Sequence, residues 1–449
     1  MSDPTGWRPS VPPIEDPGAR ANAHSARGAR LAGEGRFREA VHEFRAALAL
    51  VPGNPIALNN LAMTLGRAGA LQSDRSQLSE AVDFLRGAIQ IQPSAVGLYQ
   101  NLAAVLALAD RPVEALAALE EAVQLEPSNE RTLGLRSLAR LTLGDYDRGW
   151  DHFDPVLGNP AARAREIPGV PRWRGETMPG ALLINGQEEG QGDCIQGIRF
   201  AAEARRRVGA VVALVPPSLA RLVAHAPGLD RVETDRGRLP AVAAQVVPMD
   251  LAAVFQPKRE TITGAAYLTA DPAAVDRWRP IVRAVPGLRV GIAWQGNPAF
   301  HLDTCRSFRL DEMGPLARVD GVSLISLQKG PAVAQRTAAG FPTTDLGPSY
   351  DAGDWLETTA VVHLLDLVIT SDSALAHLAG ALGTPIWVAL ARPADWRWLV
   401  DRDDSPWYRS MRLFRQKTPG EWGPVFQQIA EALAGMEARS RGRENTSIV

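Results

Sequence analysis

Short apolar runs alternate with segments of helical periodicity through the C-terminal two thirds of the chain, most clearly between residues 364 and 398. The β-branched run 364–370 has the composition of a strand buried on both faces. The polar triplet 371–373 favours a helix N-terminus, and an Ala- and Leu-rich segment follows it as far as Gly383, a residue typical of a helix C-cap. With the next apolar run, 386–390, the pattern predicts a βαβ unit.

The start of this helix is a candidate phosphate site. When a helix begins at the carboxyl edge of a parallel sheet, its first N–H groups and its positive dipole end attract anions. Ser371, Asp372 and Ser373 lie in this segment, and the two hydroxyls can add hydrogen bonds. The alternative is a purely structural βαβ unit with ordinary capping.

The same alternation occurs elsewhere and predicts two Rossmann-like domains. One block begins with the short strand 181–185, and a second begins with the strand 288–294. Each continues with alternating helical and apolar segments, which is the pattern of an open parallel sheet. Two facing domains of this kind are expected to hold a substrate between them.

The first third of the chain has a longer period, typical of tetratricopeptide repeats (TPRs). The motif Ala-x3-Phe/Leu-x2-Ala-x4-Pro occurs three times. The second and third copies are 34 residues apart, whereas the first and second are 41 apart, and we predict an inserted polar loop at residues 71–77. The motif residues are Ala40, Phe44, Ala47 and Pro52, then Ala81, Leu85, Ala88 and Pro93, then Ala115, Leu119, Ala122 and Pro127.

A fourth unit ends at residues 143–150, where Gly149 replaces the repeat alanine and Trp150 follows it. We predict a capping repeat that joins the array to the next domain. Stacked repeats form a concave surface that usually binds a peptide or protein. The alternative role of such an array is to hold subunits together.

The composition is that of a globular protein with several domains. The chain has 449 residues, and its net charge of −2 does not indicate nucleic-acid or membrane-surface binding. Cys194 and Cys305 are too few for a disulfide framework or a zinc site and fit a reducing cytoplasm. Neither a signal peptide nor an apolar run of membrane-spanning length is apparent. We expect a soluble, cytoplasmic protein.

The expected fold class is α plus α/β, with a helical repeat array before a pair of Rossmann-like domains. Composition and turn residues suggest the boundaries. In chain order we expect a disordered N-terminus (1–20), the TPR array (21–154), a linker (155–180), two Rossmann-like domains (181–286 and 287–435) and a polar tail (436–449).

Loops at the ends of the predicted strands carry the candidate chemistry, because an open parallel sheet binds ligands at its carboxyl edge. In the loop 189–193, Gly190 and Gly192 let the backbone approach a ligand closely. Asp193 begins the next helix. Its carboxylate can act as a general base for an acceptor hydroxyl, or it can simply cap the helix, and both roles stay open.

Two further loops carry groups suited to a diphosphate. The loop after strand 288–294 contains an arginine, which offers bidentate donors to phosphate oxygens. The loop after strand 322–327 contains a lysine, which can neutralise a leaving diphosphate. The alternative for both side chains is simple exposure to solvent. The candidate residues are Gly296, Asn297, Arg306, Ser307, Gln328 and Lys329.

The fourth loop is the helix start after residue 370, which adds His377 four residues beyond Ser373 on about the same helical face. A histidine in an Ala- and Leu-rich helix is either a ligand contact or a packed core residue. No group of His, Cys or carboxylate residues in the sequence has metal-ligand spacing, and we expect neither a metal nor a cofactor. Together the four loops suit a nucleotide-diphosphate ligand.

These motifs resemble those of bacterial TPR proteins with a C-terminal glycosyltransferase domain of the GT-B fold. That domain is similar to the lipopolysaccharide heptosyltransferases and, more distantly, to the O-linked N-acetylglucosamine transferases. The resemblance implies an acceptor-side first Rossmann-like domain and a second one that binds a nucleotide-diphosphate sugar. The matching segments are 144–150, 189–196, 291–307, 326–330, 364–398, 405–408 and 412–416.

The resemblance also implies roles for individual residues. In heptosyltransferases the aspartate of the glycine-rich loop is the proposed base, and it corresponds here to Asp193. The family's Asp-Thr/Ser-x3-His motif contacts the donor sugar and phosphates, and it corresponds to Asp372, Ser373 and His377. The family's basic residue after the first strand of the second domain corresponds to Arg306.

Other positions match or depart from the family pattern. Lys329 matches the Ser-Leu-Gln-Lys-Gly pattern of the repeat-bearing relatives. The usual Glu-Gln-Gly-Leu-Gly-Asp loop reads Glu-Glu-Gly-Gln-Gly-Asp at 188–193, and the usual Asn-Asp-x2-Arg-Ser reads Leu-Asp-Thr-Cys-Arg-Ser at 302–307. Both departures leave the identity of the acceptor open.

The sequence therefore predicts a metal-independent, inverting glycosyltransferase that moves a sugar from a nucleotide-diphosphate donor to an acceptor hydroxyl. The TPR array would hold a protein or peptide acceptor or partner. One alternative is a TPR scaffold whose transferase-like domain binds a nucleotide or nothing. Another is an isomerase or epimerase of nucleotide sugars on the same fold.

Overall fold

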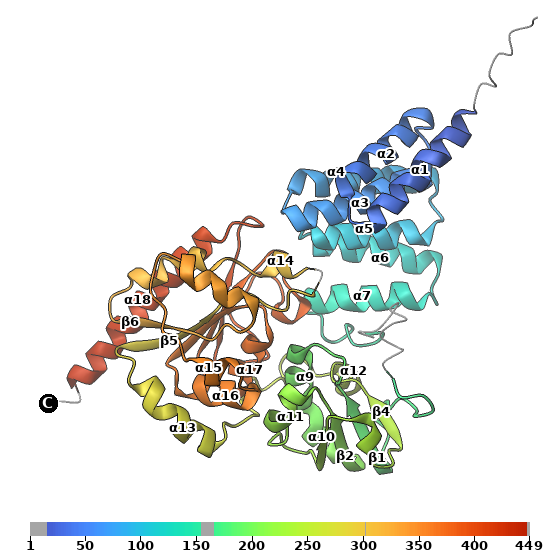
Figure 1. The fold of residues 1–449 in the computed structure, drawn as a ribbon. Helices are drawn as coiled ribbons and strands as arrows, with labels where there is room; N and C mark the ends of the chain where they lie inside the picture. The colour runs from blue at the N-terminus through green and yellow to red at the C-terminus, as the bar shows by residue number, and fades with distance from the viewer. Residues whose placement is uncertain (1–15, 154–165, 301, 447–449) are drawn as a thin grey trace, which may run out of the picture. The chain divides into compact units, whose positions relative to one another are not determined.

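The computed structural model describes residues 16–153, 166–300 and 302–446, and the chain divides into two compact units, residues 1–127 and 128–449 (Figure 1). The predicted disordered N-terminus, linker and tail lie partly outside the described residues. Within the described part, helix α1 begins at Pro17 and strand β1 at Met178.

The first unit is an array of helical hairpins in which α1 packs against α2, α3 against α4 and α5 against α6. The Ala, Phe and Leu positions of the predicted motif lie in α2, α4 and α6, and each of them is at most 2% exposed. Small alanines let neighbouring helices approach, and the larger side chains fill the space between them. The helices are α1 (Pro17–Gly33), α2 (Phe37–Leu50), α3 (Pro55–Gln72), α4 (Arg75–Ile91), α5 (Val96–Leu108) and α6 (Pro112–Leu125).

The extra residues between the first two motifs lengthen helices. The predicted polar loop at 71–77 is therefore wrong, because α3 and α4 are joined by Ser73 and Asp74 alone. The Asp74 side chain accepts hydrogen bonds from the backbone N–H groups of Ser76 and Gln77 at 2.9 and 3.3 Å, and Ser73 adopts the left-handed conformation with φ 54°. These polar residues terminate α3 and cap α4.

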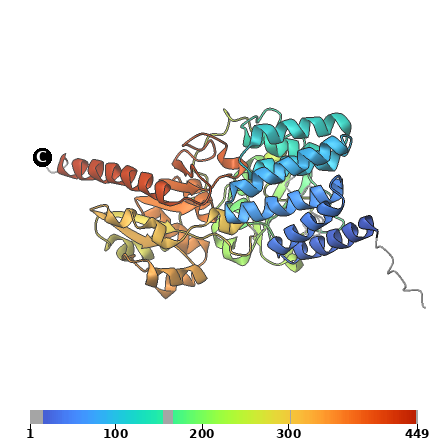
Figure 2. The ribbon, with the colours of Figure 1, turned by 90° about the horizontal axis from the view of Figure 1, so that it is seen from above.

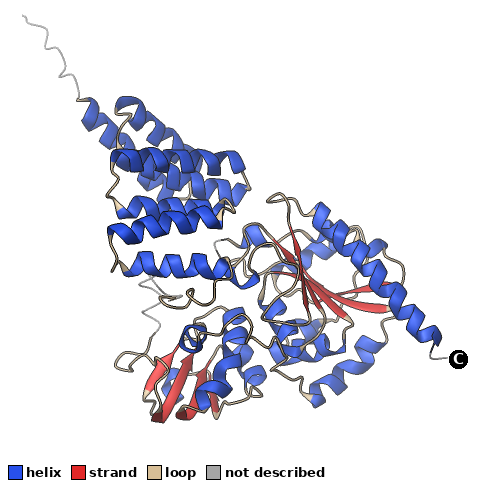
Figure 3. Cartoon of the chain, turned by 180° about the vertical axis from the view of Figure 1, so that it is seen from behind, coloured by secondary structure: helices blue, strands red, loops and turns tan. Residues whose placement is uncertain are grey.

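The second unit contains two parallel sheets with helices against them (Figure 3). The first has strand order β3-β2-β1-β4 and the second β6-β5-β7-β8-β9. This confirms the predicted class, a helical repeat array followed by two Rossmann-like domains. The strands are β1 (Met178–Asn185), β2 (Val208–Leu214), β3 (Arg231–Glu233), β4 (Ala244–Val246), β5 (Leu288–Ala293), β6 (Val322–Ser326), β7 (Leu367–Ser371), β8 (Ile386–Leu390) and β9 (Met411–Arg415).

The predicted βαβ unit consists of β7, α17 (Ala374–Leu382) and β8. Every residue of β7 and β8 is buried, as expected for parallel strands with both faces covered. Strand β7 begins later than predicted because Leu364 ends helix α16 (Trp355–Leu364). Gly383 ends α17 with φ 73°, the left-handed conformation that favours glycine at this position.

Two helices that pack in the second Rossmann-like domain include residues outside its expected range, 287–435. Helix α13 (Pro272–Arg283) packs on α16, and Trp278 Nε1 donates a 2.8 Å hydrogen bond to Glu357. The last helix, α18 (Gly423–Thr446), contacts β9 and continues past residue 435, where we expected the domain to end (Figure 2).

Helix α7 (Glu130–Thr142) and the segment after it belong to the second unit. The Tyr146 hydroxyl accepts a hydrogen bond from Trp407 Nε1 at 3.1 Å, and Trp150 Nε1 donates to the Pro257 carbonyl at 3.0 Å. The Trp150 ring packs edge-on against Trp396 with centroids 5.6 Å apart. Any shortened chain must therefore keep residues 128–153.

Candidate active site

Asp193 and Arg397 form an ion pair that joins a loop of the first sheet to a loop of the second. Asp193 lies in the first turn of α9 (Gln191–Gly197) after β1, and Arg397 lies in the 3-10 helix η6 (Trp396–Trp398) after β8. Arg397 Nη2 is 2.5 Å from Asp193 Oδ1. Gly190 leaves room for this carboxylate, since a Cβ there would lie 2.6 Å from Asp193 Oδ2.

Arg397 is the centre of this cluster, and it is absent from the residues predicted from the sequence. Its side chain is 11% exposed. Its Nε donates to Gln196 Oε1 at 2.5 Å, and its Nη1 donates to Asp395 Oδ1 at 2.8 Å. Burial lowers the pKa of the guanidinium, but Asp395 and Asp193 outweigh that effect and raise it, so Arg397 stays charged. The sequence signal was a single arginine between two tryptophans in the run 395–398.

Helices α9 and α17 approach closely beside this pair. A Cβ on Gly192 would lie 2.9 Å from His377 Cδ2 and 3.4 Å from Ala374 Cα, so a side chain at this position would have to displace the His377 ring. Ser373 occupies the N-cap position of α17, and its hydroxyl lies 3.2 Å from Thr370 Oγ1. The structure therefore places the predicted glycine-rich loop against the predicted phosphate-binding helix start.

His377 is a packed residue within this contact. It is 5% exposed, its ring stacks on Trp398 with centroids 5.3 Å apart, and its Nδ1 lies 2.9 Å from the Tyr408 hydroxyl. Burial lowers the pKa of His377 well below its usual value, and the positive charges of Arg397 and Arg199 lower it further. The His377 imidazole is therefore neutral. It can form hydrogen bonds, but it has no positive charge with which to attract a phosphate.

Two carboxylic acids of the cluster have raised pKa values. Burial raises the pKa of Asp193, and Arg397 counteracts this. Burial and the nearby Asp395 raise the pKa of Asp372 to about 6, while Arg306 lowers it. Perturbed acids of this kind are concentrated at functional sites, because a general base works best with a pKa near the working pH.

Because the pKa of Asp372 is raised in the folded chain, we expect this residue to make the stability of the second unit depend on pH. Both the folded and unfolded chains hold the proton below about pH 4, and the folded chain alone holds it up to about pH 6, so stability is lost as the pH rises through that window. Asp372→Asn should therefore stabilise the second unit by about 1–3 kcal/mol at pH 8 and by much less at pH 4. Denaturant unfolding followed by tryptophan fluorescence at both pH values measures the difference. Equal stabilisation at both would contradict the assignment.

The loop after β5 holds its predicted residues together. Arg306 in α14 (Asp303–Arg306) pairs with Asp303, with Nε 3.2 Å from Oδ1. The Ser307 hydroxyl accepts a hydrogen bond from the Gly296 N–H at 3.0 Å, and a Cβ on Gly296 would lie 2.6 Å from Asp303 Oδ1. The Asn297 side chain accepts from the Ala299 N–H at 3.1 Å, which closes a local turn.

Gln328 and Lys329 have different surroundings from the Asp193–Arg397 pair. The Gln328 amide accepts hydrogen bonds from the Trp294 and Gln295 N–H groups at 3.0 and 2.9 Å, so it fixes the loop after β5. Lys329 Nζ donates to the Gly353 carbonyl at 2.6 Å. Burial lowers the pKa of Lys329, and Asp351 and other carboxylates near α16 raise it.

The buried polar atoms that lack a hydrogen-bond partner within the described part of the chain include Ser371 Oγ at the carboxyl end of β7. They also include Trp294 Nε1 directly after β5 and Asp303 Oδ2 in α14. Ser371 is completely buried and Asp303 is 3% exposed. Leaving such groups unsatisfied costs about 1–3 kcal/mol each, and such groups in a native structure often mark a binding site.

The structure brings together five of the predicted residues at the facing loops: Asp193, Arg306, Asp372, Ser373 and His377. Arg397 and Asp395, which were not predicted, lie in the same cluster. Lys329 instead lies near the carboxylates beside α16. Across the described residues, no cluster of three or more His, Cys, Asp or Glu side chains could hold a metal ion. No helix in the described ranges combines the length and apolar character needed to cross a membrane.

Comparison with known proteins finds similarity along most of the chain. No family model matches it. Protein FlbA of Caulobacter vibrioides is 27% identical over 445 residues, covering 90% of this chain and 71% of FlbA. A mutant O-GlcNAc transferase of Thermobaculum terrenum is similar over 95% of this chain and 92% of its own, with 15% identity and a TM-score of 0.34. A family 9 glycosyl transferase of Veillonella parvula covers 54% of this chain and 88% of its own, with 10% identity and a TM-score of 0.41.

Proposed function

We propose that the chain is a metal-independent, inverting glycosyltransferase that uses a nucleotide-diphosphate sugar. The observation that carries this proposal is the position of Asp193, a carboxylic acid of raised pKa held at 2.5 Å by Arg397 where loops of two parallel sheets meet. A half-buried acid opposite a helix N-terminus and an arginine suits removal of a proton from a hydroxyl beside a phosphate-bearing donor.

In the proposed reaction, Asp193 accepts the proton of the acceptor hydroxyl as its oxygen attacks the anomeric carbon of the donor. The bond between that carbon and the diphosphate oxygen breaks on the opposite face, so the configuration inverts. Arg306 and the start of α17 stabilise the charge that develops on the departing diphosphate. Lys329 can join them only if its ammonium leaves the Gly353 carbonyl, to which it now donates at 2.6 Å.

The competing function is a scaffold with an inactive transferase-like domain. The hydrogen bonds of Lys329 and Gln328 to the protein itself favour that alternative, since both side chains already have structural partners. Incubating the full chain with a panel of nucleotide sugars, with and without a cell extract as acceptor, separates the possibilities. A transferase releases nucleoside diphosphate in proportion to acceptor, an epimerase isomerises the sugar without that release, and a scaffold does neither.

We also propose that the TPR array holds a protein or peptide acceptor and that the protein works in the cytoplasm. Partly buried asparagines occur on successive repeats: Asn101 of α5 donates to Asn59 of α3 at 2.7 Å. Side-chain amides can bind a peptide backbone of any sequence.

A chain beginning at Ser128 should keep donor binding, because it retains Tyr146 and Trp150 with the rest of the second unit. It should lose at least nine tenths of protein transfer, because it lacks the array. Mass spectrometry of acceptor proteins measures the loss. Equal protein modification by the short and full chains would show that the array does not select the acceptor.

A further inference from the structure

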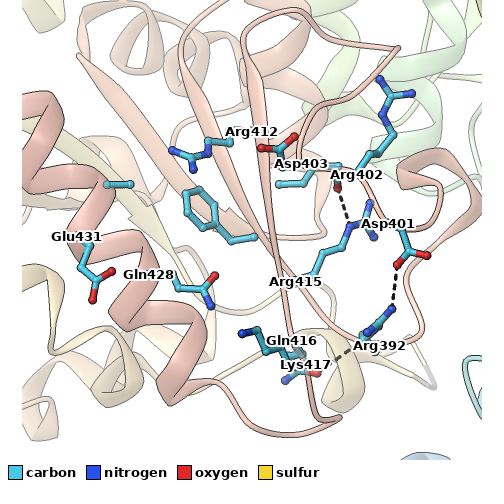
Figure 4. Close-up of a pocket in the computed structure, with 13 residues that line it drawn as sticks. Arg392, Asp401, Arg402, Asp403, Arg412, Arg415, Gln416, Lys417, Gln428 and Glu431 are labelled. Carbon is cyan, nitrogen blue, oxygen red and sulfur yellow. Dashed lines mark hydrogen bonds and ion pairs between the residues drawn. The ribbon is translucent and has the colours of Figure 1, made fainter.

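A second charged pocket lies along β9, away from the loop that carries Asp193. Its cavity of about 690 Å³ is bordered by the ends of β8 and β9, the loop 401–403 and helix α18 (Figure 4). Among the described residues that line it, five are basic and three acidic, in a chain of net charge −2. The basic residues are Arg392, Arg402, Arg412, Arg415 and Lys417, and the acidic ones are Asp401, Asp403 and Glu431.

The basic side chains differ in how firmly the protein itself holds them. Arg402 makes a close two-pronged pair with Asp404 at 2.6 and 2.7 Å, and Arg415 donates to the carbonyls of Arg402 and Trp398. Arg392 meets Asp401 at 3.4 Å, and Asp401 is 82% exposed, so solvent weakens that pair.

Arg412 is positioned by aromatic rings. It lies on the edge strand β9, and its guanidinium carbon is 4.6 Å from the centre of the Phe414 ring. Stacking on a ring holds a guanidinium in one orientation and leaves its N–H groups available at the edge. Lys417 lies two residues after the end of β9 and is exposed. The Arg412 side chain is therefore suited to meet a ligand from solvent.

Gln416 supplies a buried donor at the same pocket. It is 1% exposed, and its Oε1 accepts hydrogen bonds from the N–H groups of Arg392 and Gly420 at 3.3 and 3.2 Å. Those two donors fix which end of the amide is oxygen. Its Nε2 has no hydrogen-bond partner among the described residues. An anionic oxygen in the pocket would satisfy it.

We propose that this pocket binds a small phosphorylated molecule at a site separate from the Asp193–Arg397 centre. Several forked cationic donors and a buried amide suit the many oxygens of a diphosphate better than a single carboxylate. The cavity has the size of small-ligand sites, which are about 300–1,000 Å³. The site also borders the loop between β8 and β9, which carries Arg397, so its ligand would hold the segment that positions that arginine.

Calorimetric titration of the full chain with pyrophosphate at low salt tests the proposal. We expect pyrophosphate to bind at least tenfold more tightly than inorganic phosphate and to weaken with added salt. Arg412→Ala/Lys417→Ala should weaken pyrophosphate binding at least tenfold. Lys258→Ala/Arg283→Ala, which removes the same charges from exposed positions elsewhere, should leave it unchanged.

A variant that binds pyrophosphate more tightly also tests the proposal, because a misfolded protein would lose affinity and would not gain it. Figure 4 shows Glu431 on α18 at the side of the pocket opposite Arg392. Removing its negative charge with Glu431→Gln should tighten pyrophosphate binding about two- to fivefold. The proposal is overturned if the full chain does not bind pyrophosphate, if Arg412→Ala/Lys417→Ala binds it normally, or if Arg306→Gln abolishes all of the binding. None of these results depends on sugar transfer, so they leave the proposed enzyme activity untouched.

Discussion

Asp193→Asn is expected to slow sugar transfer at least a hundredfold while donor affinity stays within about threefold. Asparagine keeps the shape of the side chain but cannot accept the acceptor proton. Because burial raises the pKa of Asp193, the wild-type rate should also fall as the pH drops toward that raised value, where the base becomes protonated. Initial rates of nucleoside diphosphate release across pH 5–9 measure both effects.

The matched control for this variant is Asp276→Asn, which changes an aspartate that is 73% exposed on α13. It should transfer sugar at the wild-type rate. Tryptophan fluorescence shows whether Asp193→Asn is folded, since every tryptophan except Trp7 lies in residues 128–449. A folded Asp193→Asn with undiminished turnover would remove Asp193 from the reaction.

Arg397→Met should destabilise the second unit by about 2–4 kcal/mol. The substitution leaves the carboxylates of Asp193 and Asp395 without their cation and the Gln196 amide without its donor. Breaking a fully buried pair costs about 3–5 kcal/mol, and the lower figure here allows for the 34% exposure of both carboxylates. Denaturant unfolding at pH 7.5, followed by tryptophan fluorescence, measures the loss.

A double-mutant cycle separates the pair from the rest of the contacts of Arg397. If the Asp193–Arg397 pair is coupled, the destabilisation by Asp193→Asn and Arg397→Met together should fall short of the sum of the single effects by about 1–3 kcal/mol. Additive effects would mean that Arg397 acts through Asp395 and Gln196 alone. Arg283→Met, at an exposed position on α13, should change stability by less than about 0.5 kcal/mol.

Local patterns predicted the framework of this protein well. The buried positions of α2, α4 and α6 follow from a spacing that places small and large apolar residues on one helical face. The βαβ unit around α17 was predicted because its strands, its helix and Gly383 all give short-range signals. The segment 71–77 was wrongly predicted to be a loop, because the polar residues that cap helices are the same types that occur in loops.

The site was harder to predict, because its key contacts join residues far apart in the chain. Asp193 was predicted as a candidate from its glycine-rich loop, but its partner is 204 positions away, and nothing local to Arg397 marks it as that partner. Lys329 was chosen for its charge, although tertiary packing directs it to the Gly353 carbonyl. His377 fits the family motif, and the structure adds that its ring is buried and stacked on Trp398.

The most direct measurement of the central proposal is calorimetric binding of nucleoside diphosphates to the full chain and to Arg306→Gln. We predict that at least one nucleoside diphosphate binds the wild-type chain and that Arg306→Gln weakens this binding at least tenfold, whereas Arg283→Gln leaves it unchanged. The opposite result, either no binding by any nucleoside diphosphate or equal binding by Arg306→Gln, would contradict a donor site at the facing loops of the two sheets.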